Sequence, residues 1–549
     1  MNGICARAMA GIVVAASVAG WTLAYAETPI TAVPPAALRA TTAKSATAAL
    51  ILLAAAPATR VALPEPTAAE RASLRLRNAS GARTGGKTST LKGLAVAFPR
   101  EVPPESQTLR LDTLAWQSLA DGGRAAKVDV ASPGASALRV ALSITPASTG
   151  VALRFVGNGA HAQPFGPVAA RVIASDAARF GGYWSPVLDG DVATLELSVA
   201  AGVDVNATTL TLLRVSHQVV STASLTKLDA KNVQDIGLAG PCNVDVACVN
   251  PRTPAFLDST KAVAAEEMTK EDGFTYLCTG TLLNDSLSSN TPYFFSAAHC
   301  IDSALAASTL NTFWFFEAAS CGSGGVPPFI QQASGAALLA RSDDWDWALV
   351  RLNVPPPSGS HFSAWRAEPV ATATTVSIIH HPQGDLKKWS EGVTHGDDAF
   401  EDGTSFTAVV YTRGTTEPGS SGAGLLTLLA SAGYYEVRGG LWSGDASCSN
   451  PTGSDDYSRL DNMLPLTRQY LTPNAPGPAD QQVAIEFYNR SLDHFFITTS
   501  AAEAADLDSG VHAGWERTGL RFLAYSSPVA GANPVCRYYR TPGFGNSHF

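Results

Sequence analysis

The sequence predicts an all-β protein whose largest domain is a double six-stranded β-barrel. Charged residues make up 15% of the 549 residues, while Ala, Gly, Ser, Thr and Pro are abundant, a composition that suits β-rich domains better than a helical enzyme. Short runs in which apolar and polar residues alternate recur along the chain, separated by Gly, Asn and Pro, as in sandwiches and barrels. A chain of this length exceeds one core, so we expect several domains.

The first 26 residues have the pattern of a signal peptide. Arg7 precedes an apolar stretch from Ala8 to Ala24, and a cleavage site of the A-x-A type ends at Ala26. We therefore expect the protein to be secreted, either to the periplasm or out of the cell. A second apolar run at residues 46–58 is short and interrupted by Pro57, which favours a propeptide or lipid-proximal segment over stable membrane insertion.

Residues 27–236 are predicted to form an N-terminal region in two parts. Residues 27–85 are rich in Ala, Pro and Thr without sustained periodicity, and we expect them to be weakly structured. From about Leu109 to Val219 apolar and polar residues alternate. This period of two, bounded by Gly and Asn turns, predicts a small β-sandwich.

Six cysteines fall within residues 237–471, the region predicted to form the double barrel. They are Cys242, Cys248, Cys278, Cys300, Cys321 and Cys448. An even set within one domain of an exported protein predicts three disulfides. The set has no C-x-x-C pair and no histidine pair at ligand spacing, so we expect no metal. Cys536 is left over.

The C-terminal part is predicted to be a linker, residues 472–482, followed by an aromatic repeat module, residues 483–549. The sequence around Phe487 and Phe495 recurs about fifty residues later, and the chain stops inside the second copy, so we expect the module to be incomplete. Its aromatics form either a core or a platform for a cell-surface or glycan ligand; they are Phe487, Tyr488, His494, Phe495 and Trp515.

A glycine-rich turn at residues 417–424 carries a candidate nucleophile. A nucleophilic serine must be presented on a tight turn with its own N–H aimed into an anion-binding hole, and Gly419 and Gly422 permit that backbone path. We therefore predict Ser421 as the nucleophile and the N–H groups of Gly419 and Ser421 as the oxyanion hole. Taken alone, the turn is equally compatible with a surface loop.

A histidine and an aspartate complete the candidate site. His299 ends an apolar strand and is followed by Cys300, whose natural partner is Cys278 on the preceding strand; a disulfide there would hold a general base rigidly. Asp346 lies between two tryptophans at the start of a strand, where an unpaired acid would be costly.

Two neighbouring acids, Asp343 and Asp344, are interpreted as solvated turn residues. The chain order His, Asp, Ser is that of the chymotrypsin class and excludes the orders of subtilisin and the α/β-hydrolases.

Five ordered segments resemble the lysyl endopeptidases, secreted bacterial serine proteases of the trypsin-like superfamily. The segments are residues 237–248, 278–284, 297–300, 379–382 and 416–422. The resemblance spans residues 237–471 and implies the disulfides Cys242–Cys448, Cys248–Cys321 and Cys278–Cys300. It also implies that the upstream β-rich region is a propeptide.

The resemblance further implies a specificity carboxylate at Asp455, which would receive a lysine ammonium; a solvated acidic turn is the alternative. Trypsin's own specificity position is Thr415 here. Where the family has a histidine–glycine pair beside the substrate, this chain has Trp442 and Ser443, which we expect to line the substrate site. Ser443 adds a side chain, so strict preference for lysine stays open. His380 and His381 match a family motif and are expected to be structural or to lie at the edge of the site.

Activation is expected to differ from that of ordinary trypsin-like zymogens. The residue before the nucleophile is Ser420, whereas the usual switch needs an aspartate to bind a newly cut N-terminus. The Cys242–Cys448 disulfide is a candidate substitute. Ile236 precedes the family's usual start, so Lys227 and Lys231 are the nearest self-cleavage candidates.

The sequence therefore predicts a secreted serine endopeptidase that cleaves protein or peptide substrates after lysine through an acyl-enzyme. The alternatives are an Arg/Lys or broader specificity, or a surface- or glycan-binding protein with a vestigial protease domain. The net charge of −9 is spread without a basic block, which argues against nucleic-acid binding. We expect no cofactor, and a monomer.

Overall fold

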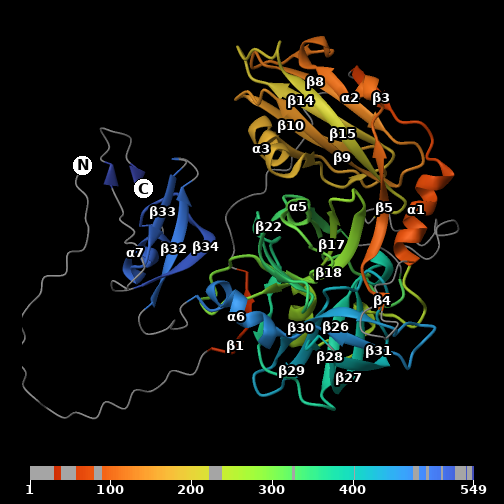
Figure 1. Cartoon of the computed structure of the whole chain (residues 1–549), viewed down its shortest axis with the longest axis vertical. Coiled ribbons are helices and arrows are strands. Elements are labelled where there is room, and N and C mark those ends of the chain that lie inside the picture. Colours follow the sequence, from red (N-terminus) through yellow and green to blue (C-terminus); the bar gives the residue numbers. More distant parts are fainter. Residues whose placement is uncertain are drawn as a thin grey trace, which may run out of the picture. The chain divides into compact units, whose positions relative to one another are not determined.

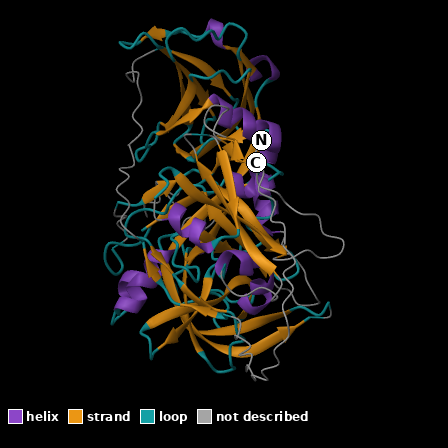
Figure 2. Ribbon diagram, turned by 90° about the vertical axis from the view of Figure 1, so that its left-hand side faces the viewer, coloured by secondary structure: helices purple, strands orange, loops and turns teal. Residues whose placement is uncertain are grey.

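The computed structural model describes twelve ranges of the chain, and strands dominate them (Figure 2). They are residues 30–38, 57–79, 90–221, 238–323, 328–400, 402–473, 481–489, 492, 494–508, 511–525, 539–540 and 547–548. The larger of two compact units holds residues 34–284 and 292–463, and the smaller one includes residues 464–549. The predicted signal peptide, the lysines 227 and 231 and Cys536 lie outside the described residues.

The N-terminal part of the larger unit is a β-sandwich, as predicted (Figure 1). One sheet follows the order β11 (Phe165–Ala169), β10 (Val151–Gly157), β14 (Val192–Val199), β8 (Arg124–Ala131) and β3 (Ala58–Ala62), with β7 (Gln117–Ser118) beside β8. Strands β12 (Tyr183–Trp184), β13 (Leu188–Asp189), β9 (Ala137–Thr145), β15 (Thr209–Gln218) and β6 (Thr108–Arg110) form the other face. Apolar side chains from both sheets make one core, including Val128, Leu195, Leu142 and Leu212.

The expectation of weak structure for residues 27–85 is wrong for β3 and for helix α1 (Ala68–Ala79). Leu74 of α1 packs against Phe98 of strand β5 (Leu94–Glu101), and Glu70 pairs with Arg100 at 3.1 Å. This packing is tertiary, and a helix of this length would be marginal alone. The composition of residues 27–85 therefore did not indicate these two elements.

Strand β5 joins the sandwich to the catalytic part of the unit. It pairs with β15 on one side and with β18 (Thr275–Leu283) on the other, both antiparallel. One 13-stranded sheet therefore runs through both parts.

The first barrel surrounds a core that includes Phe294, Trp314 and Val350. Its strands are β17 (Val263–Thr269), β18, β19 (Tyr293–Ser296), β20 (Asn311–Trp314), β21 (Ile330–Gln332), β22 (Ala336–Ser342) and β23 (Trp347–Leu352). The path β22-β23-β19-β18-β17-β20-β21 is continuous, but no ladder among the described residues joins its two ends. This barrel is therefore open.

The second barrel is a closed ring of six strands. They are β26 (Thr375–His380), β27 (Lys388–Ala399), β28 (Ser405–Arg413), β31 (Ser454–Tyr457), β30 (Tyr434–Gly444) and β29 (Gly424–Leu429), and β29 pairs with β26 to close the ring. Its core includes Val376, Ile378, Leu425 and Leu441. The predicted all-β class is confirmed, with one barrel closed and one open.

Short elements complete the larger unit. They are β2 (Ala36–Ala37), β4 (Thr90–Leu91), β16 (Val244–Asp245), β24 (His361–Phe362), β25 (Ala364–Arg366), α2 (Pro104–Gln107), α3 (Ala170–Phe180), α4 (Pro254–Ala262) and α5 (Ala304–Ser308). Helix α6 (Leu460–Leu471) follows the second barrel.

The smaller unit contains a three-stranded sheet. Strands β32 (Gln481–Asn489), β33 (His494–Thr498) and β34 (Trp515–Tyr525) form it, α7 (Ala501–Asp508) packs on it, and β35 (Tyr539–Arg540) pairs with β36 (Ser547–His548). Phe487 belongs to its core and Trp515 packs against that core, whereas the Phe495 side chain is 52% exposed. The predicted aromatics thus divide between core and surface.

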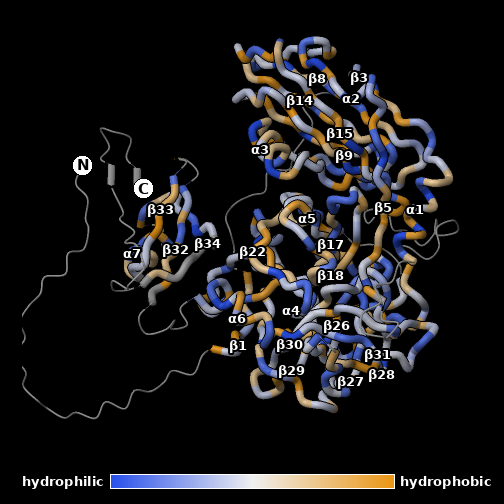
Figure 3. The backbone as a smooth tube through the Cα atoms, viewed as in Figure 1, coloured by the Kyte–Doolittle hydropathy of each residue, from blue (hydrophilic) through white to orange (hydrophobic). Residues whose placement is uncertain are grey.

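Hydropathy varies along the longer strands of the larger unit, with polar and apolar residues interchanging along the tube (Figure 3). This is what half-buried strands require. Among the described residues, none of the helices has both the length and the apolar character needed to cross a membrane.

Candidate active site

The structure brings His299, Asp346 and Ser421 together at the junction of the two barrels. His299 Nε2 lies 2.7 Å from Ser421 Oγ, and His299 Nδ1 lies 2.8 Å from Asp346 Oδ2. The backbone N–H of His299 also donates to Asp346 Oδ1 at 2.8 Å. The carboxylate therefore fixes both the ring and the backbone of the histidine, which is the arrangement that makes imidazole a general base for a serine.

Asp346 precedes β23, at the end of the turn that leads into the strand. Its exposed fraction is 4%, and its φ of 45° places a non-glycine residue in the left-handed region. Such a backbone persists only where the surroundings enforce it, and it is concentrated at functional sites. The neighbouring acids 343 and 344 are exposed, as predicted for turn residues.

The turn that carries Ser421 depends on its two glycines. Gly419 has φ 100°, and a Cβ there would lie 2.7 Å from the His381 carbonyl oxygen. Gly422 has φ 80°, and a Cβ there would lie 2.5 Å from Ser296 Oγ. Any side chain at either position would force the loop apart, so the glycines hold the two N–H groups of the oxyanion hole in place.

A residue of the N-terminal part occupies this site, and no motif in the sequence points to it. The carbonyl oxygen of Lys92 accepts from the N–H groups of Gly419 at 2.5 Å and Ser421 at 3.4 Å. The two donors predicted as the oxyanion hole thus converge on one carbonyl oxygen.

The Lys92 side chain enters a buried pocket that ends at Asp455. Its Nζ lies 3.4 Å from Asp455 Oδ1 and donates to the carbonyl oxygens of Ala446 at 2.5 Å and Thr416 at 3.5 Å. The ammonium therefore has three acceptors around its three N–H groups, and both charged side chains are almost fully buried.

Asp455 is fully buried on β31, so the alternative of a solvated acidic turn is wrong. Its Oδ2 accepts from Tyr411 Oη at 2.9 Å and from Thr416 Oγ1, and its Oδ1 accepts from the Ala446 N–H at 3.2 Å. Burial raises the pKa of the Asp455 carboxyl, while Lys92 and the hydroxyl donors oppose the rise. The pocket stabilises a carboxylate that needs a cation as its partner.

Sequence inspection missed the residues that shape this pocket. A Cβ on Gly444 would fall 2.0 Å from Asp455 Oδ1, so only glycine fits beside this carboxylate. Tyr411 and Thr416 supply the hydroxyl donors. Each reaches Asp455 from about forty positions away in the chain, and the pairing of β28 with β31 brings Tyr411 beside it.

The two predicted substrate-lining residues behave differently. Ser443 pairs with Leu91 in the ladder between β30 and β4, so its backbone lies beside the Lys92 segment. The Trp442 ring stacks on Phe406 with centroids 4.0 Å apart, and Phe400 meets it edge-on at 5.4 Å. Trp442 therefore anchors β30 to an aromatic cluster with Phe400 and Phe406.

A neutral hydrogen-bond network replaces the missing aspartate of the usual zymogen switch. The Ser420 hydroxyl lies 2.8 Å from His380 Nδ1 and accepts from the Glu417 N–H at 3.2 Å, while His380 Nε2 lies 3.0 Å from Ser390 Oγ. Complete burial, together with nearby lysines, lowers the pKa of His380 to about 3. His380 is thus a neutral anchor of the oxyanion loop.

The cysteines form the three disulfides that the resemblance implied. They are Cys242–Cys448, Cys248–Cys321 and Cys278–Cys300. The first lies beside the oxyanion loop, where the Gly240 N–H donates to Glu417 at 2.8 Å. Among the described residues, the one metal-like grouping consists of Cys278, His299 and Cys300; both cysteines are disulfide-bonded, so neither can supply a thiolate.

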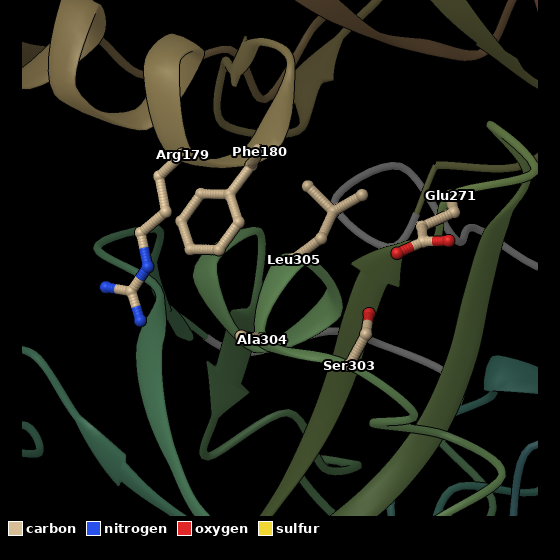
Figure 4. Close-up of a pocket in the computed structure, with 6 residues that line it drawn as sticks. All are labelled: Arg179, Phe180, Glu271, Ser303, Ala304 and Leu305. Atoms are coloured by element: carbon tan, nitrogen blue, oxygen red, sulfur yellow. The ribbon is translucent and has the colours of Figure 1, made fainter.

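A hollow in the larger unit is lined by residues outside the triad. It has a volume of about 540 Å³ and is lined by Arg179, Phe180, Glu271, Ser303, Ala304 and Leu305, between α3 of the sandwich and α5 of the first barrel (Figure 4). None of these residues belongs to the triad, the oxyanion turn or the Asp455 pocket.

A double barrel with a serine, a histidine and an aspartate at its junction defines the serine peptidases of the trypsin-like class. Residues 62–219 match the lysyl endopeptidase N-terminal domain, and residues 236–458 match the lysyl endopeptidase C-terminal domain. A lysyl endopeptidase of Pseudomonas aeruginosa is 34% identical over 377 residues, which cover 66% of this chain and 78% of that protein. The chain belongs to the lysyl endopeptidase family and is a serine-type endopeptidase.

Solved structures of other proteases are more distant. The active form of the Rv3671c protease from M. tuberculosis has a TM-score of 0.28 at 14% identity and covers 46% of this chain and 96% of its own. An HtrA-type protease, AlgW, also has a TM-score of 0.28 at 14% identity, with coverage of 42% and 66%. Similarity at this level carries no information about substrate.

Proposed function

We propose that this chain is a secreted endopeptidase that cleaves peptide bonds on the carboxyl side of lysine. The observation that carries the proposal is Lys92, whose ammonium contacts Asp455 while its carbonyl oxygen lies in the oxyanion hole. One residue thus occupies both the specificity pocket and the reactive position. This supports residues 237–471 as the catalytic domain and residues 27–236 as a propeptide.

The pocket favours lysine over arginine for a geometric reason. The Asp455 oxygen that faces away from Lys92 already accepts from Tyr411 and Thr416. A guanidinium prefers a bidentate contact with both carboxylate oxygens. The three N–H groups of an ammonium can instead each donate to a separate acceptor. The other carboxylate oxygen and two carbonyl oxygens suit the ammonium.

The chemistry follows from the positions of the side chains. His299 takes the proton of Ser421 Oγ as the oxygen attacks the lysyl carbonyl, and Asp346 stabilises the resulting imidazolium. The N–H groups of Gly419 and Ser421 bind the developing oxyanion. His299 then protonates the leaving amine, and water hydrolyses the acyl-enzyme by the reverse sequence of proton transfers. No metal or cofactor is needed for these steps.

A scan of the residue before the cleaved bond tests the specificity. Peptide amides that differ only in Lys, Arg, Glu or Leu are compared on the wild-type enzyme and on Asp455→Asn, with Asp456→Asn on the same strand as the matched control. We expect lysine to be preferred by wild type and by the control. Equal turnover of lysine and leucine by wild type would refute the proposed specificity.

Labelling with a fluorophosphonate tests the triad separately. Ser421→Ala and His299→Ala should both abolish labelling while the purified chains keep the wild-type circular dichroism. Labelling that persists in Ser421→Ala would place the nucleophile elsewhere. It would also revive the alternative of a binding protein with a vestigial protease domain, for which the exposed Phe495 is a candidate contact with a cell-surface or glycan ligand.

A further inference from the structure

Residues Thr90 to Ala97 lie across the whole active site in the manner of a bound peptide. On the side before Lys92, strand β4 pairs antiparallel with β30, with Leu91 opposite Ser443 and Thr90 opposite Gly444. On the side after Lys92, strand β5 pairs antiparallel with β18, with Leu94 opposite Leu277 and Ala95 opposite Tyr276. Extended main-chain pairing on both sides is how proteins bind peptides by strand addition.

The bond between Lys92 and Gly93 is the one presented to the nucleophile. The Lys92 carbonyl oxygen is held by the oxyanion donors, and a Cβ on Gly93 would lie 3.3 Å from His299 Cδ2 and 3.4 Å from its Nε2. The residue that would become the leaving amine is therefore next to the ring that must protonate it. Glycine fits this position because a larger residue would crowd the imidazole.

We propose that Lys92–Gly93 is a self-cleavage site at which the enzyme cuts its own N-terminal region. The inference rests on the proposed lysine specificity and extends it to a particular bond. Ser421 Oγ bonds to the Lys92 carbonyl carbon, and its proton passes through His299 to the Gly93 nitrogen as the peptide bond breaks. Water then hydrolyses the Lys92–Ser421 ester, leaving a Lys92 carboxylate, a free Gly93 amine and the regenerated hydroxyl.

Both new chain ends stay anchored after this cut. Gly93 leads into β5, which is hydrogen-bonded between β15 and β18. On the other side, β3 pairs with β8 of the same sandwich, and Leu74 of α1 packs on β5. Because β4 pairs with β30 and Gly93 leads into the paired strand β5, both segments beside the cut keep main-chain partners.

A buried arginine holds the sandwich to the first barrel independently of the cut segment. Arg139 of β9 donates to Thr269 Oγ1 at 2.8 Å and to the Thr309 carbonyl oxygen at 2.6 Å. Its guanidinium is 1% exposed. The cut N-terminal region therefore remains in the cleft as an inhibitor, and turnover of other substrates requires its later removal.

The test follows the fate of the full chain. Wild type, Ser421→Ala, Lys92→Gln and Lys87→Gln are purified, and their fragments are identified by N-terminal sequencing and intact mass. Lys87→Gln is the matched control, since it removes a lysine of the same stretch and leaves Lys92 in place. We expect a fragment starting at Gly93 from wild type and Lys87→Gln, and none from the other two.

Dilution and a second substitution make the result decisive. An intramolecular cut should proceed at the same rate over about a hundredfold dilution. Gly93→Val keeps the lysine in its pocket but crowds His299, so the Gly93 cut should slow by about tenfold or more. Gly93→Val also keeps the proposal testable if Lys92→Gln fails to fold.

External lysyl peptides separate this inference from the proposed function. An enzyme that cleaves lysyl peptides yet never yields the Gly93 end would overturn the self-cleavage site and leave the lysine specificity intact. A Gly93 end that also appears in Ser421→Ala would show that another protease makes the cut. External cleavage without lysine preference would overturn the proposed specificity, whatever happens at Gly93.

Discussion

The two barrels each bury a carboxylate close to the candidate active site, and the two acids have opposite surroundings. In the closed second barrel, Asp455 faces an ammonium, two hydroxyls and a backbone N–H. In the open first barrel, Glu266 of β17 is 0% exposed and accepts from Ser296, while its Oε2 has no hydrogen-bond partner within the described part of the chain. Burial raises the pKa of Glu266 to about 8.

This contrast shows that burial alone does not make an acid a binding residue. Asp455 has donors that favour its charged form, so it can attract a lysine. Burial raises the pKa of Glu266, and only one hydroxyl donor opposes the rise. Glu266 therefore carries a proton at neutral pH and contributes no charge to the site. The neighbours, and not the depth, decide which acid is functional.

The largest expected effect comes from removing the charge of Asp455. Asp455→Asn removes the partner of a buried ammonium, and truncating one side of such a pair costs about 3–5 kcal/mol. We therefore expect kcat/KM for lysyl peptides to fall by roughly a thousandfold. The parallel change Glu266→Gln should leave it within about threefold. Steady-state kinetics on both variants measure the two losses in kcat/KM. Equal losses would show that the two acids do not differ in function.

The second prediction concerns stability and its dependence on pH. The folded state keeps a proton on Glu266 up to about pH 8, whereas the unfolded carboxyl ionises near its ordinary pKa of 4.5. Since the folded pKa is raised, the stability that this group contributes is present below pH 4.5 and is lost as pH rises toward 8.

Glu266→Gln should remove this loss. At pH 8 the variant should be more stable than wild type by about 4 kcal/mol, and near pH 4 the two should be alike. Urea unfolding of the Ser421→Ala background at both pH values measures the difference without self-digestion. A difference that is the same at pH 4 and pH 8 would show that the carboxyl does not titrate as described.

The smallest expected effect tests the oxyanion loop, which carries both Ser420 and Ser421. Ser420→Ala removes the hydroxyl that His380 and the Glu417 N–H contact. A loosened oxyanion loop should lower kcat by about tenfold with little change in KM. Ser420→Thr, which keeps the hydroxyl, should recover most of the loss. A change in KM alone would instead indicate damage to the lysine pocket.

The candidate site could be predicted from the sequence where chemistry and local pattern coincide. His299 sits between an apolar strand and a cysteine, and Ser421 sits in a turn with glycines on both sides; each signal is contained within about eight residues of chain. Their order along the chain selected the class. The resemblance then supplied the disulfide pairs and Asp455, whose burial on β31 the structure added.

Lys92 could not be singled out from the sequence, because nothing local distinguishes this lysine from Lys227 or Lys231, which lie outside the described residues. Its significance arises from contacts with residues more than three hundred positions away, Thr416 and Ala446. It also depends on β5, which composition placed next to a weakly structured segment. The lysine becomes a substrate only when the sheet of the sandwich continues into the first barrel.

The amino-acid sequence by itself thus determined the strand pattern, the class of enzyme and the candidate nucleophile, base and acid, because each of these is written in short segments with a chemical requirement. Only the tertiary structure decided which buried acid has a cation as partner, how Ser420 is held without the usual aspartate, and which bond of the chain lies in its own active site. These depend on closing a barrel and adding a strand, which bring distant residues within hydrogen-bond distance, and no local pattern encodes that.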